Sequence, residues 1–169
     1  MNLLSEIENR YSVRDFLGKS VEEDKLLRIL EAGRRAPSAK NRQPWRFIVS
    51  QEERQRKKFE EAAYGQEYVG AAPCIISICT TNVDYKMPNG ELAHPIDLSF
   101  AVSFMMVQAQ AEGLGTCVVT TFREADVREL LTVPYSMKVI MLLLLGYPGG
   151  EGVKGERKKL DQIVSFEHW

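Results

Sequence analysis

The stretch of residues 95–121 reads PIDLSFAVSFMMVQAQAEGLGTCVVTT, which predicts a helix followed by a strand. Its first part predicts a long helix that Pro95 opens and that ends near Glu112. Apolar side chains lie on nearly every side of this helix. A helix of that kind is buried, often against a partner as well as against its own sheet. The glycines of Gly113-Leu114-Gly115 stop the helix, and residues 116–121 predict a buried strand.

Helices and strands alternate on both sides of this stretch. Helical patterns are expected at residues 2–9, 20–36, 52–63 and 123–131, and strand patterns at 45–50, 74–80 and 138–146. Ser20 and Glu23 fit a capping box at the start of the second helix. Such an order predicts a sheet covered on both faces by helices, in an α/β or α+β arrangement. With 169 residues, 44% of them apolar, we expect one domain, residues 1–169.

The chain ends on an apolar segment that follows a glycine-rich one. Residues 146–155 are rich in glycine and proline and predict an extended, mobile tether. The apolar side chains that follow are Leu160, Ile163, Val164, Phe166 and Trp169. An apolar segment on a flexible arm usually docks elsewhere, and another subunit is the natural candidate.

Charge and hydropathy exclude several functional classes. The 22 basic and 23 acidic side chains leave a net charge of −1, so no global field favours nucleic acid or an anionic membrane. The first ten residues lack the basic and apolar regions of a secretion signal. The longest apolar run, Val139–Leu145, is too short to cross a bilayer. We therefore expect a soluble cytoplasmic protein.

The cysteines and histidines give no catalytic or metal signature. Cys74, Cys79 and Cys117 lie in apolar stretches without a paired spacing, which favours buried structural thiols over a disulfide framework or a nucleophile. His94 and His168 have no cluster of cysteines or carboxylates beside them, so no zinc site is expected. No Ser-His-Asp set, Walker loop or paired-carboxylate motif is visible, and no catalytic side chain is assigned.

Two basic segments suit phosphate. Arg10-Tyr11-Ser12-Val13-Arg14 places two arginines around a hydroxyl group, and the planar guanidinium suits bidentate phosphate binding. Lys154-Gly155-Glu156-Arg157-Lys158-Lys159 follows the tether with four basic residues. Taken alone, each segment also reads as a solvated stretch of surface charge.

The loop PSAKNRQPW, residues 37–45, suits recognition of a planar heterocycle. Two prolines fix it, and the five side chains between them that can hydrogen-bond are Ser38, Lys40, Asn41, Arg42 and Gln43. The alternative is a capped connection between a helix and a strand, with Trp45 in the core.

Residues 112–117, EGLGTC, superficially resemble the glycine fingerprint of dinucleotide-binding domains. That fingerprint needs a strand before it and a helix after it. Here the expected order is helix and then strand, so we reject the Rossmann interpretation.

Taken together and in this order, these segments resemble the nitroreductase family. The resemblance covers nearly the whole chain, through residues 10–16, 36–47, 97–122, 146–148 and the basic stretch before Trp169. It implies an α+β fold with a central mixed or antiparallel sheet covered by helices. It also implies a homodimer whose subunits exchange C-terminal segments, with FMN bound between the subunits.

The resemblance implies a set of residues for the FMN phosphate. The positions that match phosphate ligands are Arg10, Ser12 and Arg157. Relatives often carry a lysine two positions before Arg157, where this chain has Gly155. Lys154 and Lys158 are therefore both candidates for that role.

Other matches imply contacts with the flavin ring. From the same subunit these are Arg14 beside the pyrimidine edge, Gln66 at the ribityl or pyrimidine edge, and Thr120 and Thr121 at a strand end near the ring. From the partner subunit they are Pro37, Ser38, Ala39 and Asn41. In such proteins the flavin carries the chemistry, while the protein positions and tunes it.

The implied activity is reduction of nitroaromatics, quinones or similar acceptors by NAD(P)H, with donor and acceptor using one site in turn. The alternatives are other chemistry on the same fold, namely reductive dehalogenation, flavin fragmentation or oxidation of a peptide heterocycle. A flavin-binding protein without catalysis is a further alternative, because fold alone does not settle function.

Overall fold

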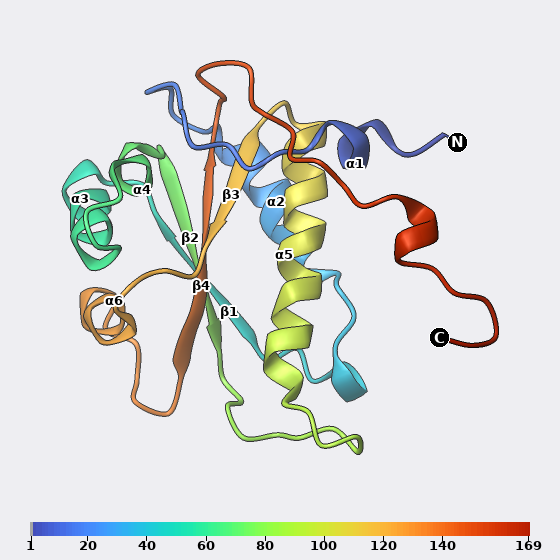
Figure 1. Ribbon diagram of the computed structural model, residues 1–169. Helices are drawn as coiled ribbons and strands as arrows, with labels where there is room; N and C mark the ends of the chain where they lie inside the picture. The colour runs from blue at the N-terminus through green and yellow to red at the C-terminus, as the bar shows by residue number, and fades with distance from the viewer. Residues whose placement is uncertain (1) are drawn as a thin grey trace.

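The computed structural model describes residues 2–169, and its centre is a four-stranded sheet (Figure 1). The strands lie in the order β1-β2-β4-β3, with bounds Trp45–Ser50 (β1), Cys74–Thr80 (β2), Lys138–Gly146 (β4) and Gly115–Val119 (β3). All three neighbouring pairs are antiparallel. This confirms the expected α+β fold, with the sheet in its antiparallel form.

Helices cover both faces of this sheet, as expected. One face carries α2 (Glu23–Arg34) and α5 (Ala93–Ala111), and the other carries α3 (Glu53–Ala62), α4 (Glu67–Ala71) and α6 (Glu124–Leu130) (Figure 1). The remaining helical pieces are α1 (Ser5–Asn9) and two 3-10 turns, η1 (Ala39–Asn41) and η2 (Leu160–Gln162). The short α4 is an element that the sequence pattern did not predict.

The alternation of strand side chains divides the core into two layers. Along β2, Ile76 and Ile78 pack in the layer with α2 and α5, whereas Ile75 and Cys79 pack in the layer with α3, α4 and α6. Successive side chains of a strand point to opposite faces of a sheet. Because both faces are covered, every residue of β2 is buried.

The turn between α5 and β3 requires a glycine at position 113. Gly113 has a φ of +74°, its N–H donates to the Gln110 carbonyl at 3.1 Å, and the Leu114 N–H donates to the Ala109 carbonyl at 2.8 Å. These two bonds form a Schellman motif, which ends a helix on a residue in the left-handed conformation. The order of helix and then strand is confirmed, and with it the rejection of a dinucleotide fingerprint.

Two boundaries in the 95–121 stretch differ from expectation. α5 begins at Ala93, so Pro95 lies inside the first turn and does not open the helix. Proline is tolerated there because the first N–H groups of a helix have no partner within it. β3 ends at Val119, so Thr120 and Thr121 follow the strand and do not belong to it.

The capping box expected at Ser20 is wrong. α2 begins at Glu23 with Glu22 at its N-cap, and no side chain caps it. Glu22 serves another contact, because its Oε2 atom accepts a hydrogen bond from the Tyr147 hydroxyl at 2.7 Å.

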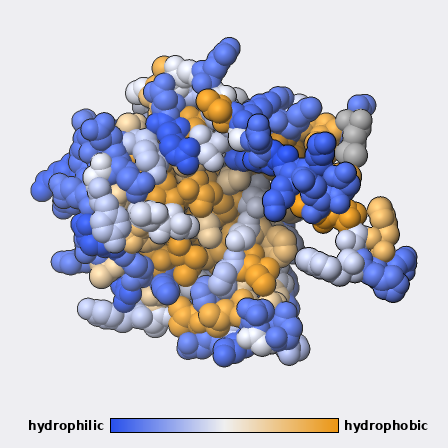
Figure 2. Space-filling model, in the orientation of Figure 1, coloured by the Kyte–Doolittle hydropathy of each residue, from blue (hydrophilic) through white to orange (hydrophobic). Residues whose placement is uncertain are grey.

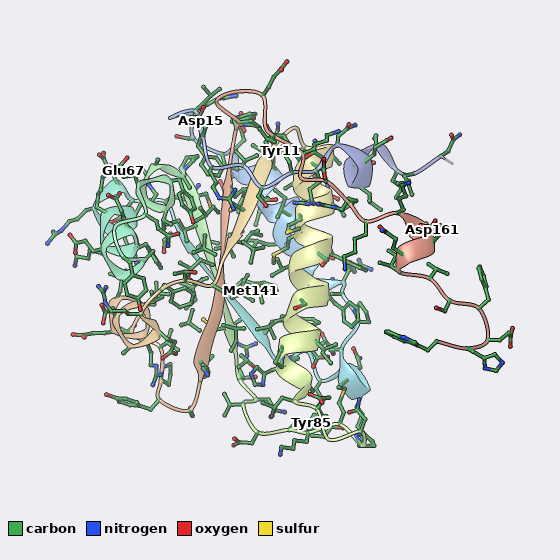
Figure 3. The ribbon with its side chains drawn as sticks, in the orientation of Figure 1. Tyr11, Asp15, Glu67, Tyr85, Met141 and Asp161 are labelled. Atoms are coloured by element: carbon green, nitrogen blue, oxygen red, sulfur yellow. The ribbon has the colours of Figure 1, made fainter. Side chains whose placement is uncertain are left out.

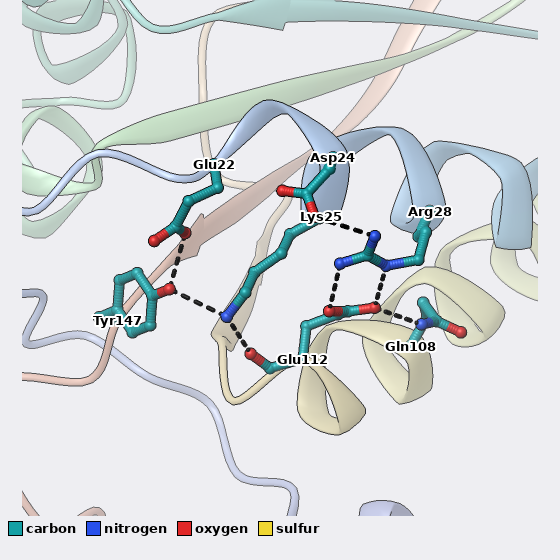
Figure 4. Close-up of polar contacts among 7 residues, drawn as sticks. All are labelled: Glu22, Asp24, Lys25, Arg28, Gln108, Glu112 and Tyr147. Carbon is teal, nitrogen blue, oxygen red and sulfur yellow. Dashed lines mark hydrogen bonds and ion pairs between the residues drawn. The ribbon is translucent and has the colours of Figure 1, made fainter.

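That contact belongs to a polar network that joins three distant elements (Figure 4). Lys25 Nζ donates to the Tyr147 hydroxyl at 3.0 Å and to the Glu112 carbonyl at 2.8 Å, and Arg28 donates to both Glu112 carboxylate oxygens, at 2.6 and 2.9 Å. The start of α2, the end of α5 and the residue after β4 are thereby tied together. The Tyr147 hydroxyl lowers the pKa of Glu22 to about 2, and Arg28 lowers the pKa of Glu112 to about 2.

The first part of the glycine-rich segment 146–155 is anchored, which corrects the expectation of a mobile tether. The Gly149 N–H donates to the Asp15 carbonyl at 2.8 Å. A Cβ atom at Gly152 would lie 1.7 Å from the Tyr11 ring. Glycine is therefore required here because two segments approach closely, and not for mobility.

Apolar surface remains uncovered on α5 and on the C-terminal segment, and Figure 2 shows apolar patches on this side of the molecule. α5 buries one side in the core, as expected, but Ile96, Phe100 and Phe104 are exposed by 39%, 46% and 44%. We call these three residues the α5 stripe. Residues 151–169 are exposed throughout, and their last part leaves the body of the molecule (Figure 1). No helix within residues 2–169 has both the length and the apolar character needed to cross a membrane.

Candidate functional site

The segment Arg10–Arg14 lies against the free edge of β3. The Val13 N–H donates to the Thr116 carbonyl at 2.9 Å, and Ser12 forms a β-bridge with Thr116. Val13 is buried, while Ser12 and Arg14 on either side of it are exposed. Because neighbouring side chains of an extended segment point in opposite directions, burial of Val13 turns the two polar side chains outward.

A hollow of about 250 Å³ lies between this segment and the start of the C-terminal segment. Its lining residues are Arg10, Tyr11, Ser12, Arg14, Val153, Lys154, Gly155 and Arg157. We call this the basic hollow. The structure thus brings together four residues that the sequence singled out from opposite ends of the chain, namely Arg10, Ser12, Arg14 and Arg157.

The structure distinguishes between the two candidate lysines. Lys154 lines the basic hollow, and its Nζ atom donates to Asn9 Oδ1 at 3.0 Å. Lys158 is not among the lining residues. Lys154 is therefore the better placed of the two to compensate for Gly155.

The cations of the basic hollow are free of carboxylate partners. Within residues 2–169, none of Arg10, Arg14, Lys154 and Arg157 takes part in an ion pair. The acidic side chains nearby, Asp15 and Glu151, line a neighbouring hollow and do not line the basic hollow. Four unpaired cations around one cavity favour binding of an anion with more than one negative charge.

Gln66 and Thr121 lie together beyond the other end of β3. Gln66 Nε2 donates to the carbonyls of Ala63 and Thr121, at 2.8 and 3.0 Å, and its Oε1 atom accepts from the Tyr68 hydroxyl at 2.6 Å. Both N–H groups of the amide are used inside the protein. Gln66 therefore fixes the backbone of Thr121, which the sequence alone did not indicate.

Tyr68 is a residue that the sequence reasoning missed. The Arg14 Cζ atom lies 5.8 Å from the centre of its ring, and its hydroxyl donates to Gln66. Tyr68 thus connects the basic hollow with the Gln66–Thr121 pair along β3. The only local signal is its position two residues after Gln66, at the start of a helix too short to be recognised.

Hydrogen bonds within the Pro37–Pro44 loop and to neighbouring segments fix its conformation. The Ala39 N–H donates to Oδ1 of the buried Asp97 at 2.8 Å, the Gln43 N–H donates to Ser38 Oγ at 2.9 Å, and the Thr81 N–H donates to the Pro44 carbonyl at 2.8 Å. The loop also contains three residues with φ between 50° and 53°, namely Lys40, Asn41 and Gln43. It is a preorganised structure, and Trp45 after it is buried in the core, as the alternative interpretation had it.

In one chain this loop and the basic hollow lie at opposite ends of α5. Ala39 is bonded to Asp97 in the second turn of the helix, whereas Thr116, which pairs with Ser12, follows the end of the helix at Ala111. At 1.5 Å per residue, Asp97 and Ala111 are separated by about 20 Å. Figure 3 shows Tyr11 of the basic hollow at one end of α5 and Tyr85, whose ring lies against Arg42 of the loop, at the other. The two parts of the site predicted from the sequence do not meet within a single chain.

The cysteines and His94 are buried residues. All three cysteines are buried, as expected, and burial raises the pKa of Cys74 to about 12 and that of Cys79 to about 11. His94 is buried with its Nδ1 atom unpartnered, and burial lowers its pKa. In the part of the chain that the structure describes, no group of three or more histidine, cysteine or acidic side chains is placed to hold a metal ion.

Comparison with known proteins finds relatives over nearly the whole chain. The model of the Nitroreductase family matches residues 7–73 and 61–147. A protein named NADH dehydrogenase from Thermus thermophilus is 30% identical over 92% of this chain and 91% of its own length. More distantly, an iodotyrosine deiodinase from Daphnia pulex is 26% identical, with 94% of this chain and 63% of its own length covered.

Solved structures share the fold over the whole chain. A nitroreductase family protein from Clostridium difficile 630 has a TM-score of 0.87 at 33% identity, with both chains covered completely. An FMN-dependent nitroreductase from Clostridium difficile R20291 has a TM-score of 0.86 at 26% identity, over 99% of this chain and 100% of its own.

Proposed function

The chain belongs to the nitroreductase family, and on that premise we propose that it is an FMN-dependent oxidoreductase, folded as one domain over residues 1–169. It takes electrons from NAD(P)H and passes them to small acceptors such as nitroaromatics or quinones. The observation that carries this proposal is the basic hollow, where unpaired cations from both ends of the chain meet beside β3.

The residues of the basic hollow fit a phosphate group. A phosphate monoester carries between one and two negative charges near neutral pH, and Arg10 with Arg157 supplies two positive charges. Guanidinium groups bind phosphate oxygens in a bidentate manner. The Ser12 hydroxyl adds a donor, and Lys154 takes the place of the lysine absent at Gly155. We assign the FMN phosphate to these residues.

The neighbouring residues along β3 suit the isoalloxazine ring. FMN, when bound, supplies the hydride chemistry. We place Arg14 beside the polar edge of the isoalloxazine ring, with the aromatic face of Tyr68 behind its guanidinium group. Thr120 and Thr121 border it at the end of β3, where Gln66 fixes the Thr121 backbone. The chain thus contributes charge, shape and orientation, and needs no catalytic triad.

A homodimer completes this site. The Pro37–Pro44 loop lies about 20 Å along α5 from the basic hollow, so it contributes to a flavin site only across a subunit interface. The uncovered apolar side chains supply that interface. They comprise the α5 stripe together with Leu3, Leu4 and Ile7 near α1. Burying apolar area of this kind drives association.

We infer that the C-terminal segment packs on a surface of the second subunit. Leu160, Ile163 and Phe166 are exposed by 60%, 63% and 85% in one chain. An open groove of about 500 Å³ lies between α2 and the β1 edge, and the apolar residues in its lining are Leu27, Leu30, Phe47 and the largely buried Trp45. We infer that the partner's last residues, 159–169, pack on such apolar surface.

Donor and acceptor are proposed to use this site in turn. With FMN held at the basic hollow and the partner's Pro37–Pro44 loop beside it, donor and acceptor would share one site, so NAD(P)H would leave before the acceptor enters. This order predicts ping-pong kinetics, in which changing the acceptor concentration shifts apparent kcat and KM in proportion.

A second candidate chemistry is reductive dehalogenation. It is favoured by the match to the iodotyrosine deiodinase from Daphnia pulex, which this chain covers over 63% of its length. The matches that cover the relative almost completely favour NAD(P)H-linked reduction instead.

The test is to identify the bound cofactor and to follow its reduction and reoxidation. Purified protein should release FMN, and not FAD, in mass spectrometry. NADH or NADPH should bleach its absorbance, and stopped-flow reoxidation should rank nitroaromatics and quinones above iodotyrosine. Bound FMN that neither nicotinamide reduces would reject the enzyme in favour of a flavin-binding protein.

A further inference from the structure

Lys40 and Arg42 form a second cluster of cations, at the opposite end of α5 from the basic hollow. The Arg42 Cζ atom lies 3.8 Å from the centre of the Tyr85 ring, and Lys40 Nζ lies 5.7 Å from the same centre. Both side chains are exposed, and within residues 2–169 neither has an ion-pair partner. By contrast, the arginines of α2 and α6 all pair with carboxylates.

The positions of these two cations are set by the backbone. Lys40 has a φ of +53°, a conformation that most side chains avoid. The loop keeps this conformation because Asp97 holds the Ala39 N–H on one side and Ser38 holds the Gln43 N–H on the other. Lys40 and Arg42 therefore extend from a fixed turn toward one aromatic ring, without the help of any ligand.

We propose that Lys40 and Arg42 bind the 2′-phosphate of NADPH and make NADPH the preferred electron donor. The inference rests on the proposed function, which sets the Pro37–Pro44 loop beside the flavin of the partner subunit. In this proposal, the adenosine half of a nicotinamide that stacks on that flavin would pass the loop.

The chemistry of the cluster matches a 2′-phosphoadenosine group. Arginine stacks on aromatic faces and donates from its edge, and an arginine of this kind accommodates the 2′-phosphate in NADP-binding proteins. Arg42 uses one face on Tyr85, which leaves its other face for the adenine and its N–H edge for the phosphate. A phosphate monoester carries close to two negative charges at neutral pH, which Lys40 and Arg42 together balance.

The FMN phosphate does not compete for this cluster. It is assigned to the basic hollow of the partner subunit, whereas the Pro37–Pro44 loop is assigned to the ring end of that flavin. NADH lacks the 2′-phosphate and gains nothing from either cation. The cluster therefore raises affinity for one donor over the other and leaves flavin binding alone.

Steady-state kinetics with both donors on the FMN-loaded enzyme tests the selectivity. The variants are Arg42→Ala and Lys40→Asn, since asparagine tolerates a positive φ. The control is Arg54→Ala, which removes an exposed cation from α3, on the other face of the sheet. Loss of one charge-assisted hydrogen bond should lower kcat/KM for NADPH about tenfold to a hundredfold. In these variants kcat/KM for NADH should stay within about threefold of the wild-type value. The control variant should change kcat/KM for neither donor.

Calorimetric titration provides a readout that does not depend on turnover. Adenosine 2′,5′-bisphosphate should bind the FMN-loaded enzyme at least about tenfold more tightly than 5′-AMP, and Arg42→Ala should abolish the difference. If the variants lose kcat/KM equally for NADH and NADPH, the inference is overturned, because equal losses would indicate a contact with the pyrophosphate that both donors share. A wild-type preference for NADH would overturn it too. If neither donor reduces the flavin, the proposed function fails, while the titration still decides the phosphate site.

Discussion

Gly115 and Gly146 face each other across β3 and β4, and the space beside each is occupied. A Cβ atom at Gly115 would lie 2.3 Å from Val13 Cγ2, and one at Gly146 would lie 2.6 Å from Pro73. Gly115 therefore lets the Arg10–Arg14 segment lie close against the sheet edge, which sets the basic hollow, whereas Gly146 leaves room for Pro73.

The first prediction is that Gly115→Ala weakens FMN binding through this contact. Valine is stiff at χ1, so Val13 must shift and carry its polar neighbours with it. Overpacking of this kind costs about 1–3 kcal/mol, and we expect the FMN dissociation constant to rise by about tenfold in a fluorescence titration. The matched control is Gly18→Ala, because nothing lies within 4 Å of a Cβ there. Unchanged FMN affinity in Gly115→Ala would show that the segment does not set the site.

The second prediction concerns Asp97, which holds the Pro37–Pro44 loop. Asp97→Ala removes the acceptor for the Ala39 N–H and should lower the free energy of unfolding by about 1–3 kcal/mol in urea. Asp97→Asn keeps a side-chain oxygen and should restore most of it. Amide hydrogen exchange at Ala39 should accelerate in the alanine variant alone. Equal exchange rates in the two variants would mean that the bond does not hold the loop.

The third prediction is a loss of stability in acid. The pKa values of Glu22, Glu31 and Glu112 lie at about 2 in the folded chain, below the ordinary value of 4.5. A carboxyl group whose pKa is lowered by folding stabilises the protein above its unfolded pKa. That stabilisation is lost as the pH falls through the folded pKa. Thermal midpoints should therefore decline between about pH 4.5 and pH 2.

Tyr147→Phe tests the contribution of Glu22 to this decline. It removes the hydroxyl that donates to Glu22 and leaves the ring under Lys19 in place. The variant should have a lower thermal midpoint at pH 7 and a shallower decline in acid. A decline parallel to that of the wild type would exclude this contact as a source of the pH dependence.

The fourth prediction is that residues 159–169 are needed for the dimer. In one chain these residues are exposed, so deleting them from a monomer would cost almost nothing. In the proposed dimer they are buried, and each large apolar side chain that is fully buried contributes about 1.5–3 kcal/mol. Light scattering should show partial or complete dissociation of the truncated protein, with loss of flavin. A truncated protein that remains dimeric and flavin-loaded would contradict the exchange of C-terminal segments.

Sequence reasoning succeeded where the signal is local and failed where it depends on contacts between distant segments. The end of α5 was predictable because Gly113 alone supplies the left-handed residue of the turn. The anchoring of residues 146–155 was not, because Gly152 is required by Tyr11, more than 130 positions earlier. The start of α2 was misplaced for the same reason, since Glu22 is engaged by Tyr147.

The candidate site shows the same division. The residues that the resemblance implied, Arg10, Ser12, Arg14 and Arg157, line one hollow, while their roles toward FMN stay a prediction. Nothing in the sequence showed that Lys154, and not Lys158, faces them, because that depends on how the chain crosses Tyr11. The distance between the Pro37–Pro44 loop and the basic hollow also needed the structure, since it follows from the length and direction of α5.

The last prediction separates the roles of Arg10 and Arg14, which line one hollow four residues apart. The phosphate charge is the same in both redox states, so Arg10→Ala should weaken oxidised and reduced FMN alike. Loss of a charge-assisted hydrogen bond, worth about 1.5–3 kcal/mol, raises the dissociation constant about tenfold to a hundredfold. The guanidinium group of Arg14 lies over the Tyr68 ring. We assign it to the polar edge of the flavin, where reduction adds negative charge. Arg14→Ala should therefore lower the midpoint potential and slow reduction by NAD(P)H more than it weakens binding. The measurements are FMN affinity by fluorescence and potential by dye equilibration. If both variants lose affinity and neither shifts the potential, Arg14 is only another phosphate ligand.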